Sequence, residues 1–467
     1  MRLLSVGLLA ALSVTLSPSR AAAIGELITD VRVLDNVRTE EDTVRSIAGI
    51  AIGDVLEPNT LEQVRERLNS SGLFADVNVF WEPHKEGVRV SIAVKDKFPW
   101  VPLPTFSLSP GNVAFGLLFV HGNLFGRGKQ LVAGARYSTR DSGATVVYRD
   151  PSLLGTWLYY QVQGKFQDQT VPEFDPRPDL VDRPLRETDI RSVGFEGLLG
   201  VAWLRRVKTQ FAWHIEKFDV RRVRYPHEGG RDPYGSGTAT IPEGSAGSDA
   251  VVGFARGSLI FDFRAREHAV VYGNALSLNL ESASSTWLSD LDYWKAWAGY
   301  EHYVRFFRRH NLVLAGSVYT GENLPLWNEN WLGGSSLRGY VHQQFRGDTI
   351  AKALFEYHFP LFSIGPLDFR ALGFFESGAA WYMNLPPVAP APDPMTGRPV
   401  YETRRDGRRF LPPDFLEEGF DIKRDVRNAV GGGLRFYLKS VAVPLIGIDY
   451  GYGLESKAWR FFLVIGA

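Results

Sequence analysis

Two short stretches of the chain combine glycine with opposite charges. Residues 333–340 read GGSSLRGY, and residues 374–378 read FFESG. An arginine on a glycine-flanked loop, here Arg338, needs a fixed anionic partner, and a carboxylate can supply one through two parallel hydrogen bonds from the guanidinium. Glu376 lies in the second stretch, which has the character of a strand. Its carboxylate is therefore one candidate for the anionic partner of Arg338.

Much of the chain beyond residue 98 alternates between apolar and polar side chains in segments of about ten residues. Leu276, Leu278 and Leu280, for example, alternate with polar neighbours. A period of two places the two sets on opposite faces of a sheet. In a soluble sandwich the apolar face would meet a second sheet, whereas in a membrane barrel it meets lipid and the polar face lines the lumen. The apolar faces are rich in Trp, Tyr and Phe and the opposite faces carry Gln, Glu, Lys and His, so the pattern favours a barrel of about sixteen antiparallel strands.

The composition agrees with an exported barrel. The chain has 467 residues, of which 47 are glycine, 13% are aromatic and none is cysteine. An exported protein without disulfides must be held by a large core or by a closed hydrogen-bonded barrel. Lys+Arg and Asp+Glu each number 52, and no basic stripe points to a nucleic-acid partner.

The first 23 residues have the features of a secretory signal peptide. Met1-Arg2 precedes an apolar run at residues 3–16, and small residues at Ala21 and Ala23 predict cleavage after Ala23, so that the mature chain begins at Ile24. No later segment offers the ~20 consecutive apolar residues that a spanning helix requires.

Residues 24–97 have the pattern strand, helix, helix, strand, strand. Thr39 and Thr60 are the expected N-caps of the two helices. The expected elements are strands at 27–34, 73–80 and 88–94, with helices at 40–48 and from Thr60 onward. A proline-punctuated linker at 98–104 precedes the barrel, which spans 98–467, and long loops are expected at 167–189, 219–249 and 384–427.

The order of elements in 24–97, with the run SGLFADV at 71–77, resembles one POTRA domain, a small periplasmic module. The barrel region carries further stretches in a fixed order: NLFGRG at 123–128, YRDPSLLG at 148–155, FEYHFP at 355–360 and GGGLRF at 431–436. Together with GGSSLRGY they resemble the outer-membrane assembly and translocation superfamily that includes BamA, TamA and the two-partner-secretion translocators. The resemblance implies an α+β POTRA domain followed by an all-β transmembrane barrel of the bacterial surface antigen type.

The resemblance also implies a site. In the family, the motif that matches Leu337, Arg338, Gly339 and Tyr340 lies at the tip of a long loop folded back into the barrel. Its arginine pairs with an acid on the barrel wall, here within the motif formed by Phe374, Glu376 and Gly378. The family usually has aspartate where this chain has Glu376. From the residues alone, the alternatives are a solvated loop arginine for Arg338 and an interfacial aromatic for Tyr340.

The function that the resemblance implies is the insertion or translocation of polypeptides at the outer membrane. The POTRA domain, in the periplasm, would receive an unfolded client by adding its strand to an exposed sheet edge at 73–80, which contains Leu73, Phe74, Val77 and Val79. The barrel would open laterally between its first and last strands or conduct the client through its lumen. Expected partners are outer-membrane lipids, the client and periplasmic accessory proteins. A passive pore, a structural surface barrel and a lipid-handling barrel are the alternatives.

Enzyme motifs are absent from the sequence. The stretch 122–130 fails the phosphate-loop spacing, no Gly-x-Ser-x-Gly elbow or His-Glu-x-x-His helix occurs, and the nine histidines are dispersed. Ser335 and Ser336 have no histidine and acid placed by sequence to activate them. We expect no enzymatic activity, no catalytic residue, no metal site and no cofactor.

Overall fold

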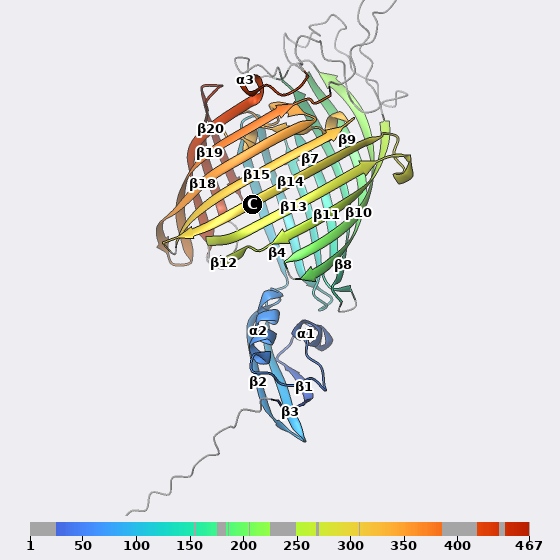
Figure 1. Cartoon of the computed structure of the whole chain (residues 1–467), viewed down its shortest axis with the longest axis vertical. Helices are drawn as coiled ribbons and strands as arrows, with labels where there is room; N and C mark the ends of the chain where they lie inside the picture. Colours follow the sequence, from blue (N-terminus) through green and yellow to red (C-terminus); the bar gives the residue numbers. More distant parts are fainter. Residues whose placement is uncertain are drawn as a thin grey trace, which may run out of the picture. The chain divides into compact units, whose positions relative to one another are not determined.

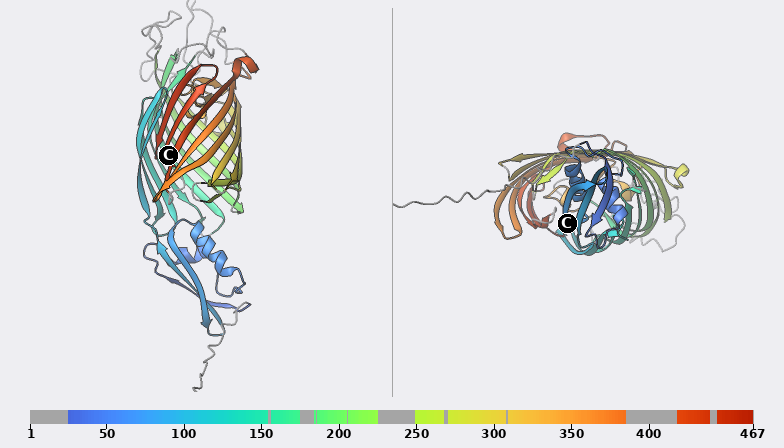
Figure 2. Two further views of the ribbon diagram at one scale, coloured as in Figure 1. Left: turned by 90° about the vertical axis from the view of Figure 1, so that its left-hand side faces the viewer. Right: turned by 90° about the horizontal axis from the view of Figure 1, so that it is seen from below.

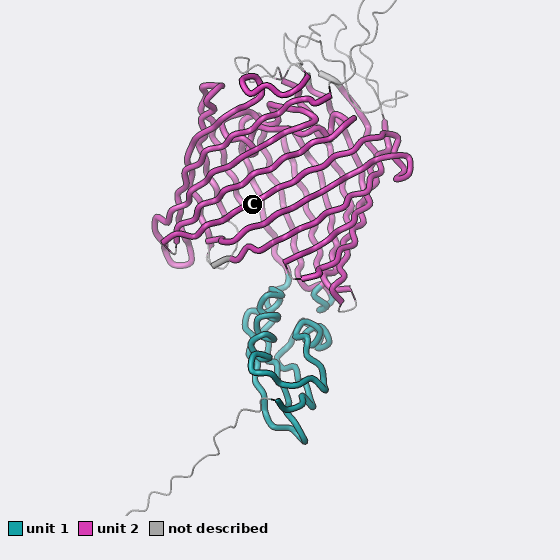
Figure 3. The backbone as a smooth tube through the Cα atoms, in the orientation of Figure 1, with its two compact units in different colours: residues 1–99, 125–128 teal, residues 100–124, 129–467 magenta. Residues whose placement is uncertain are grey.

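The computed structural model describes residues 25–153, 156–174, 184, 186–204, 206–224, 249–267, 270–307, 309–384, 418–438 and 444–466. The predicted signal peptide and its cleavage point lie outside the described residues, as do the central parts of the three predicted long loops. The chain divides into two compact units, residues 1–99 with 125–128 and residues 100–124 with 129–467 (Figure 3). Within the described ranges, no helix is both long and apolar enough to cross a membrane.

The smaller unit has two helices and a three-stranded sheet. The sheet order is β1-β3-β2, with β1 parallel to β3 and β2 antiparallel to it. Val44, Val64 and Leu68 on the helices are fully buried against the apolar strand faces. The elements are β1 (Ile28–Leu34), α1 (Glu41–Ala48), α2 (Thr60–Ser70), β2 (Phe74–His84) and β3 (Gly87–Asp96).

The predicted N-caps of both helices are wrong, although both helices are present. α1 starts after Glu40, which makes no side-chain cap, and the Thr39 hydroxyl instead donates to the carboxylate of Asp96. That carboxylate also accepts the backbone N–H groups of Val37 and Arg38, at 2.8 and 2.7 Å. A charged acceptor that binds several donors competes better for Thr39 than the helix terminus does. The N-cap position of α2 is Asn59, which makes no side-chain cap, and the Thr60 hydroxyl accepts a hydrogen bond from the backbone N–H of Glu57.

The described residues of the larger unit form a closed barrel of sixteen antiparallel strands (Figure 1). This confirms the fold class expected from the alternating pattern. The strands are β4 (Trp100–Ser109), β5 (Asn112–Leu124), β6 (Lys129–Ser138), β7 (Asp141–Asp150), β8 (Leu158–Glu173), β9 (Arg186–Leu204), β10 (Val207–Arg224), β11 (Asp249–Asp262), β13 (Val270–Ala283), β14 (Tyr293–Phe306), β15 (His310–Glu322), β18 (Thr349–Ile364), β19 (Leu367–Trp381), β20 (Val426–Leu438), β21 (Pro444–Gly453) and β22 (Ala458–Ile465). Shorter pieces are β12 (Ala265–Glu267), η3 (Ser285–Trp287) and α3 (Ile422–Asp425).

The barrel closes where β22 meets β4, a junction that we call the seam. In Figure 2 the red C-terminal strands lie beside the blue-green strands that begin the barrel. The register at the seam consists, among the described residues, of three pairs: Leu463 with Leu108, Val464 with Ser107, and Ile465 with Phe106. The neighbouring β4–β5 ladder runs over the whole length of β4. The seam is therefore a short ladder in a wall of long ones.

The strands alternate between the two sides of the wall as the sequence predicts. On β10, Phe211 is 51% exposed, whereas His214 and Glu216 are buried inside. Two predicted loops are shorter than expected, because β8 and β9 extend into 167–189 and β10 extends to Arg224. The extra residues of β8 and β9 are held by a hydrogen bond from the Thr170 hydroxyl to Asp189 at 2.7 Å and by the buried side chains of Val171 and Ile190.

A long loop, residues 323–348, connects β15 to β18 and folds back against the inner wall. It contains η4 (Leu326–Asn328), β16 (Asn330–Leu332), η5 (Gly334–Ser336) and β17 (Phe345–Gly347), and β16 pairs with β17. Leu332, Leu337, Tyr340 and Phe345 of the loop pack with wall residues on β18 and β20. We call this segment the inward loop.

Candidate functional site

The inward loop approaches the wall closely because glycines stand on both sides of the contact. Gly339 has φ of 116°, a conformation that favours glycine, and a Cβ added to it would lie 2.6 Å from the backbone nitrogen of Gly453. A Cβ on Gly451 would lie 3.0 Å from the carbonyl carbon of Arg338. The glycines of β21 therefore make room for the tip of the loop.

Arg338 and Glu376 lie together inside the barrel. The guanidinium Nε of Arg338 donates to Glu376 Oε1 at 3.0 Å, and Nη2 lies 2.9 Å from the same oxygen. The backbone N–H of Arg338 donates to the other carboxylate oxygen, Oε2, at 2.6 Å. Arg338 is 6% exposed and Glu376 is 1% exposed, so the pair is buried and Arg338 is not a solvated loop arginine.

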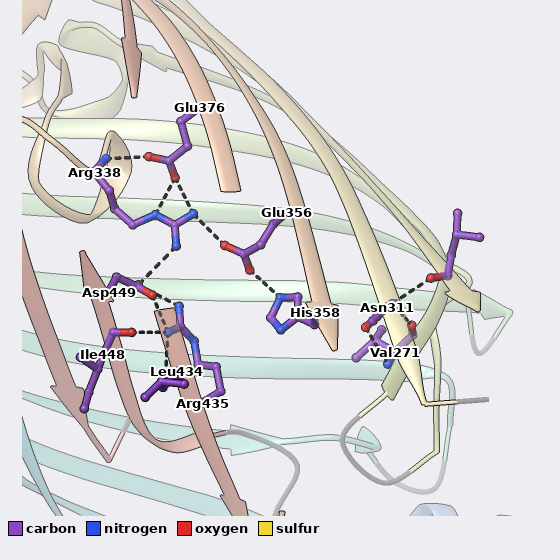
Figure 4. Close-up of polar contacts among 11 residues, drawn as sticks. Val271, Asn311, Arg338, Glu356, His358, Glu376, Leu434, Arg435, Ile448 and Asp449 are labelled. Carbon is purple, nitrogen blue, oxygen red and sulfur yellow. Dashed lines mark hydrogen bonds and ion pairs between the residues drawn. The ribbon is translucent and has the colours of Figure 1, made fainter. Parts of the chain in front are cut away.

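Two further carboxylates bind the same guanidinium (Figure 4). Nη2 donates to Glu356 of β18 at 2.7 Å, and Nη1 donates to Asp449 of β21 at 3.3 Å. The guanidinium carbon also lies 3.5 Å from the centre of the Phe374 ring, in the geometry of a cation–π contact. Arg338 thus joins strands β18, β19 and β21.

Two of the carboxylates that bind Arg338 have further partners. Asp449 is also bound by Arg435 of β20, at 2.6 and 2.8 Å, and Glu356 lies 2.6 Å from His358. Arg338, Arg435 and Lys352 line one cavity of about 660 Å³ together with the three carboxylates. Buried carboxylates of this kind are tolerated because each has a cationic or hydrogen-bonding partner. In the part of the chain that the structure describes, no group of three or more His, Cys, Asp or Glu side chains is placed to hold a metal ion.

The other residues of the two motifs have packing roles. Leu337 and Tyr340 are fully buried in the cluster that holds the loop to the wall. The Tyr340 hydroxyl donates to Glu455 and to the Asn428 carbonyl, so Tyr340 is not an interfacial aromatic. Gly378 faces the loop, where a Cβ would lie 2.9 Å from a methyl of Leu332.

Sequence reasoning did not identify Glu356, Asp449 and Arg435 as partners. A signal was present for two of them, because Glu356 and Arg435 lie in the stretches 355–360 and 431–436 that carry the family resemblance. Alternation also places Glu356 inside, since its neighbour Phe355 is 48% exposed on the other face. Nothing in the local sequence around Asp449 indicates its register with Arg435, which depends on the β20–β21 pairing.

The tip of the inward loop contacts both sides of the seam. On one side, the Ser456 hydroxyl of the β21–β22 turn donates to the Gly339 carbonyl at 3.4 Å. On the other side, the His342 N–H donates to the Pro110 carbonyl in the β4–β5 turn at 3.0 Å. The seam is therefore spanned by the loop as well as by its own short ladder.

The predicted client-binding strand is one edge of the smaller sheet. β2 pairs with β3 alone among the described strands, and Phe74, Val77 and Val79 turn their side chains into the core. Leu73 precedes the strand, and its carbonyl accepts the Lys97 N–H at 2.8 Å. The opposite edge, on β1, is partly occupied, because Ile28 exchanges backbone hydrogen bonds with Gly53 and Asp54.

A family model described as the Omp85 superfamily domain matches residues 123–456, well over half of the chain. The chain belongs to the Omp85 superfamily. A second model, POTRA, described as the surface antigen variable number repeat, matches residues 27–97. These matches confirm the predicted resemblance and establish an Omp85-type outer-membrane β-barrel with a POTRA domain.

Solved structures share this fold at low sequence identity. BamA from Haemophilus ducreyi lacking POTRA domains 1–3 is 14% identical, with a TM-score of 0.61 over 94% of this chain and 84% of that chain. CdiB from Acinetobacter baumannii is 13% identical, with a TM-score of 0.61 over 95% of this chain and 74% of that chain. CdiB from Escherichia coli is 12% identical, with a TM-score of 0.59 over 95% and 76%. No curated protein matches the sequence.

Proposed function

We propose that this Omp85 protein inserts or translocates unfolded polypeptides at the outer membrane, with its POTRA domain in the periplasm. The observation that carries the proposal is a POTRA sheet with one open edge in the same chain as a barrel whose closing ladder is short. The first feature can capture an extended chain, and the second allows the barrel wall to open.

The open edge of β2 has the properties of a strand acceptor. An added strand gains main-chain hydrogen bonds that do not depend on client sequence, which suits a set of clients defined by strand pattern. Arg65 on α2 reaches the Val79 carbonyl at 3.4 Å. That carbonyl therefore points away from β3, and the N–H of Val79 points the same way because both groups of a strand residue share one side. Val77, two residues earlier, has the same orientation.

The inward loop favours a barrel whose wall opens over a passive pore or a purely structural barrel. A passive pore or a purely structural barrel has no need of a buried arginine bound to three strands, and burying these charges costs desolvation energy. A lipid-handling barrel would share the inward loop and the short seam but would have no use for an open POTRA strand edge.

Depletion of the protein, followed by quantitative proteomics of the outer membrane and of the secreted fraction, tests the proposal. We expect the loss of particular outer-membrane or secreted proteins, and restoration by the wild-type gene but much less by an Arg338→Ala copy. An unchanged proteome together with altered lipid composition would contradict the proposal and favour the lipid-handling alternative.

A further inference from the structure

The inward loop has a second set of contacts at its base, residues 324–329, on strands that the carboxylates around Arg338 do not belong to. Leu324 and Leu326 are buried in an apolar cluster with side chains of β8, β9, β10, β11, β13 and β14. The ring of Trp327 stacks on Phe218 of β10, with ring centres 4.4 Å apart. The carboxylates that bind Arg338 lie on β18, β19 and β21. Two different parts of the wall therefore hold the loop.

A cross-strand pair of opposite charges holds one amide of the base. Glu281 of β13 and Lys295 of β14 are register partners. Lys295 Nζ donates to the backbone carbonyl of Asn328 at 2.8 Å and to its side-chain Oδ1 at 3.1 Å. Asn328 Nδ2 donates to Glu281 Oε1 at 3.3 Å, and the same oxygen accepts the Tyr293 hydroxyl at 3.0 Å. An ammonium only donates and a carboxylate only accepts, so this pair fixes the direction of the Asn328 amide.

The base is tied to the neck of the loop, which β16 and β17 form by pairing with each other. Arg346 of β17 donates through Nε to Glu329 Oε2 at 3.3 Å, and its Nη2 donates to the Leu326 carbonyl. The Tyr382 hydroxyl, just beyond β19, donates to the same oxygen of Glu329 at 3.2 Å. The base and the neck therefore form one connected unit on the wall.

The tip of the loop, residues 333–344, joins this unit through two glycines. Gly333 and Gly334 have φ of 114° and 64°, values that side chains disfavour. A few loop positions of this kind can absorb the change in backbone angles that a hinge requires. The contacts of the tip with the barrel, through Arg338, Tyr340 and His342, are separate from those of the base.

We propose that Lys295 and Glu281 are positioning residues that fix the base of the inward loop, so that the tip leaves the seam alone by rotation at Gly333 and Gly334. The base keeps its place on β13 and β14 when the contacts of Arg338 open, and the tip can return to the same position. This inference goes beyond the proposed function, because it concerns the barrel itself and holds for any class of client.

Hydrogen–deuterium exchange of the full-length protein in detergent micelles tests the inference, because amide exchange reports local opening. Mass spectrometry of peptides from the base and from the tip follows the two parts separately. Both contain hydrogen-bonded amides, including those of Asn328 and Arg338. Glu376→Ala should speed exchange in the tip at least about tenfold, as the loss of one charged hydrogen bond would, and leave the base within about twofold of the wild type.

Further variants address the base. Lys295→Met keeps an unbranched side chain without the ammonium and should speed exchange in the base at least about tenfold, since two hydrogen bonds from a charged donor are lost. Lys295→Arg keeps charged donors and should restore most of the protection. Asn328→Ala removes the side-chain amide that the pair holds and gives the same test if the Lys295→Met barrel does not fold.

Lys352→Met is the matched control, because it removes another luminal ammonium, on β18, and should leave exchange in the base unchanged. Heat-modifiable gel mobility verifies for each variant that the barrel is folded.

Faster exchange of the base together with the tip in Glu376→Ala would show that the loop moves as one body and would overturn the inference. Wild-type exchange of the base in Lys295→Met or Asn328→Ala would also overturn it, as would a Lys295→Arg base no better protected than that of Lys295→Met. No client is present in these experiments, so their failure is distinguishable from failure of the proposed function, which depletion tests.

Discussion

At the scale of single residues, the charge of Arg338 is shared among three carboxylates, so the members of this cluster are not equivalent. Loss of Arg338 leaves Glu356, Glu376 and Asp449 without their common cation, whereas loss of Glu376 leaves Arg338 two acceptors. Removing one partner of a buried pair costs about 3–5 kcal/mol, and an exposed pair contributes about 0–1 kcal/mol. A partly wet lumen places the cost between these limits.

The first prediction is that Arg338→Ala weakens loop anchoring and function more than Glu376→Ala does, while both barrels still insert in the membrane. The two substitutions should be non-additive in a double-mutant cycle on activity and on heat-modifiable mobility. Arg338→Lys serves as the control, because it keeps the charge but loses the fork geometry and should recover only part of the function. Fully additive effects would show that Arg338 and Glu376 do not act as a pair.

A second prediction concerns Asp96 in the POTRA domain. Burial acts to raise the pKa of this carboxyl, but hydrogen bonds from the Thr39 hydroxyl and the backbone N–H groups of Arg38 and Val37 outweigh it and hold the pKa below 3.8. The stabilisation is therefore complete above about pH 4, the ordinary unfolded value, and is lost as the pH falls through the lower folded value.

The measurement is urea unfolding of the isolated domain, residues 25–98, at pH 7 and pH 3. The wild-type domain should lose more stability between the two than Asp96→Asn does, because the variant lacks the titrating group. Parallel losses in the two proteins would show that other carboxyls dominate the acid sensitivity.

At the scale of elements, β2 carries the third prediction. Val79→Pro removes an outward N–H donor and should abolish client delivery, while the β3 ladder remains. Val79→Ala is the matched control, since it also shortens a buried side chain but keeps the donor. Circular dichroism of the isolated domain must show that both variants fold. Normal delivery by a folded Val79→Pro protein would exclude this edge as the receiving site.

The elements themselves were predictable because their signals are local. Period-two alternation predicted the barrel and the inner face that carries Glu376, and apolar spacing predicted both helices of the POTRA domain. The N-caps were not predictable, because Thr39 binds Asp96, a residue 57 positions away. The roles of Glu356 and Asp449 depend on cross-strand register and on how the loop enters the lumen, which are long-range properties. The ends of β8 and β9 were not predicted, because both strands continue into the stretch that was expected to be a loop.

At the scale of the whole molecule, lateral opening and conduction through the lumen can be separated at the seam. Ser107 and Val464 are register partners there, and their replacement by cysteines in a chain without other thiols creates a disulfide across the seam. If the client leaves through the wall, this variant should be inactive until it is reduced. A cysteine pair at Ala133 and Val146, which are partners in the β6–β7 ladder, should leave activity unchanged. Full activity of the oxidised Ser107–Val464 pair would instead show that clients pass through the lumen.

The contacts of the inward loop on both sides of the seam make loop position and wall opening thermodynamically linked. The His342–Pro110 hydrogen bond and the Ser456–Gly339 hydrogen bond exist together only while the seam strands keep their spacing. Any ligand that binds the displaced loop more tightly than the docked loop therefore lowers the free energy of opening. By the same linkage, a client that bound in the open seam would weaken the docking of the loop by an equal free energy. A peptide that competes with the wall for the tip of the loop is therefore expected to favour opening of the seam.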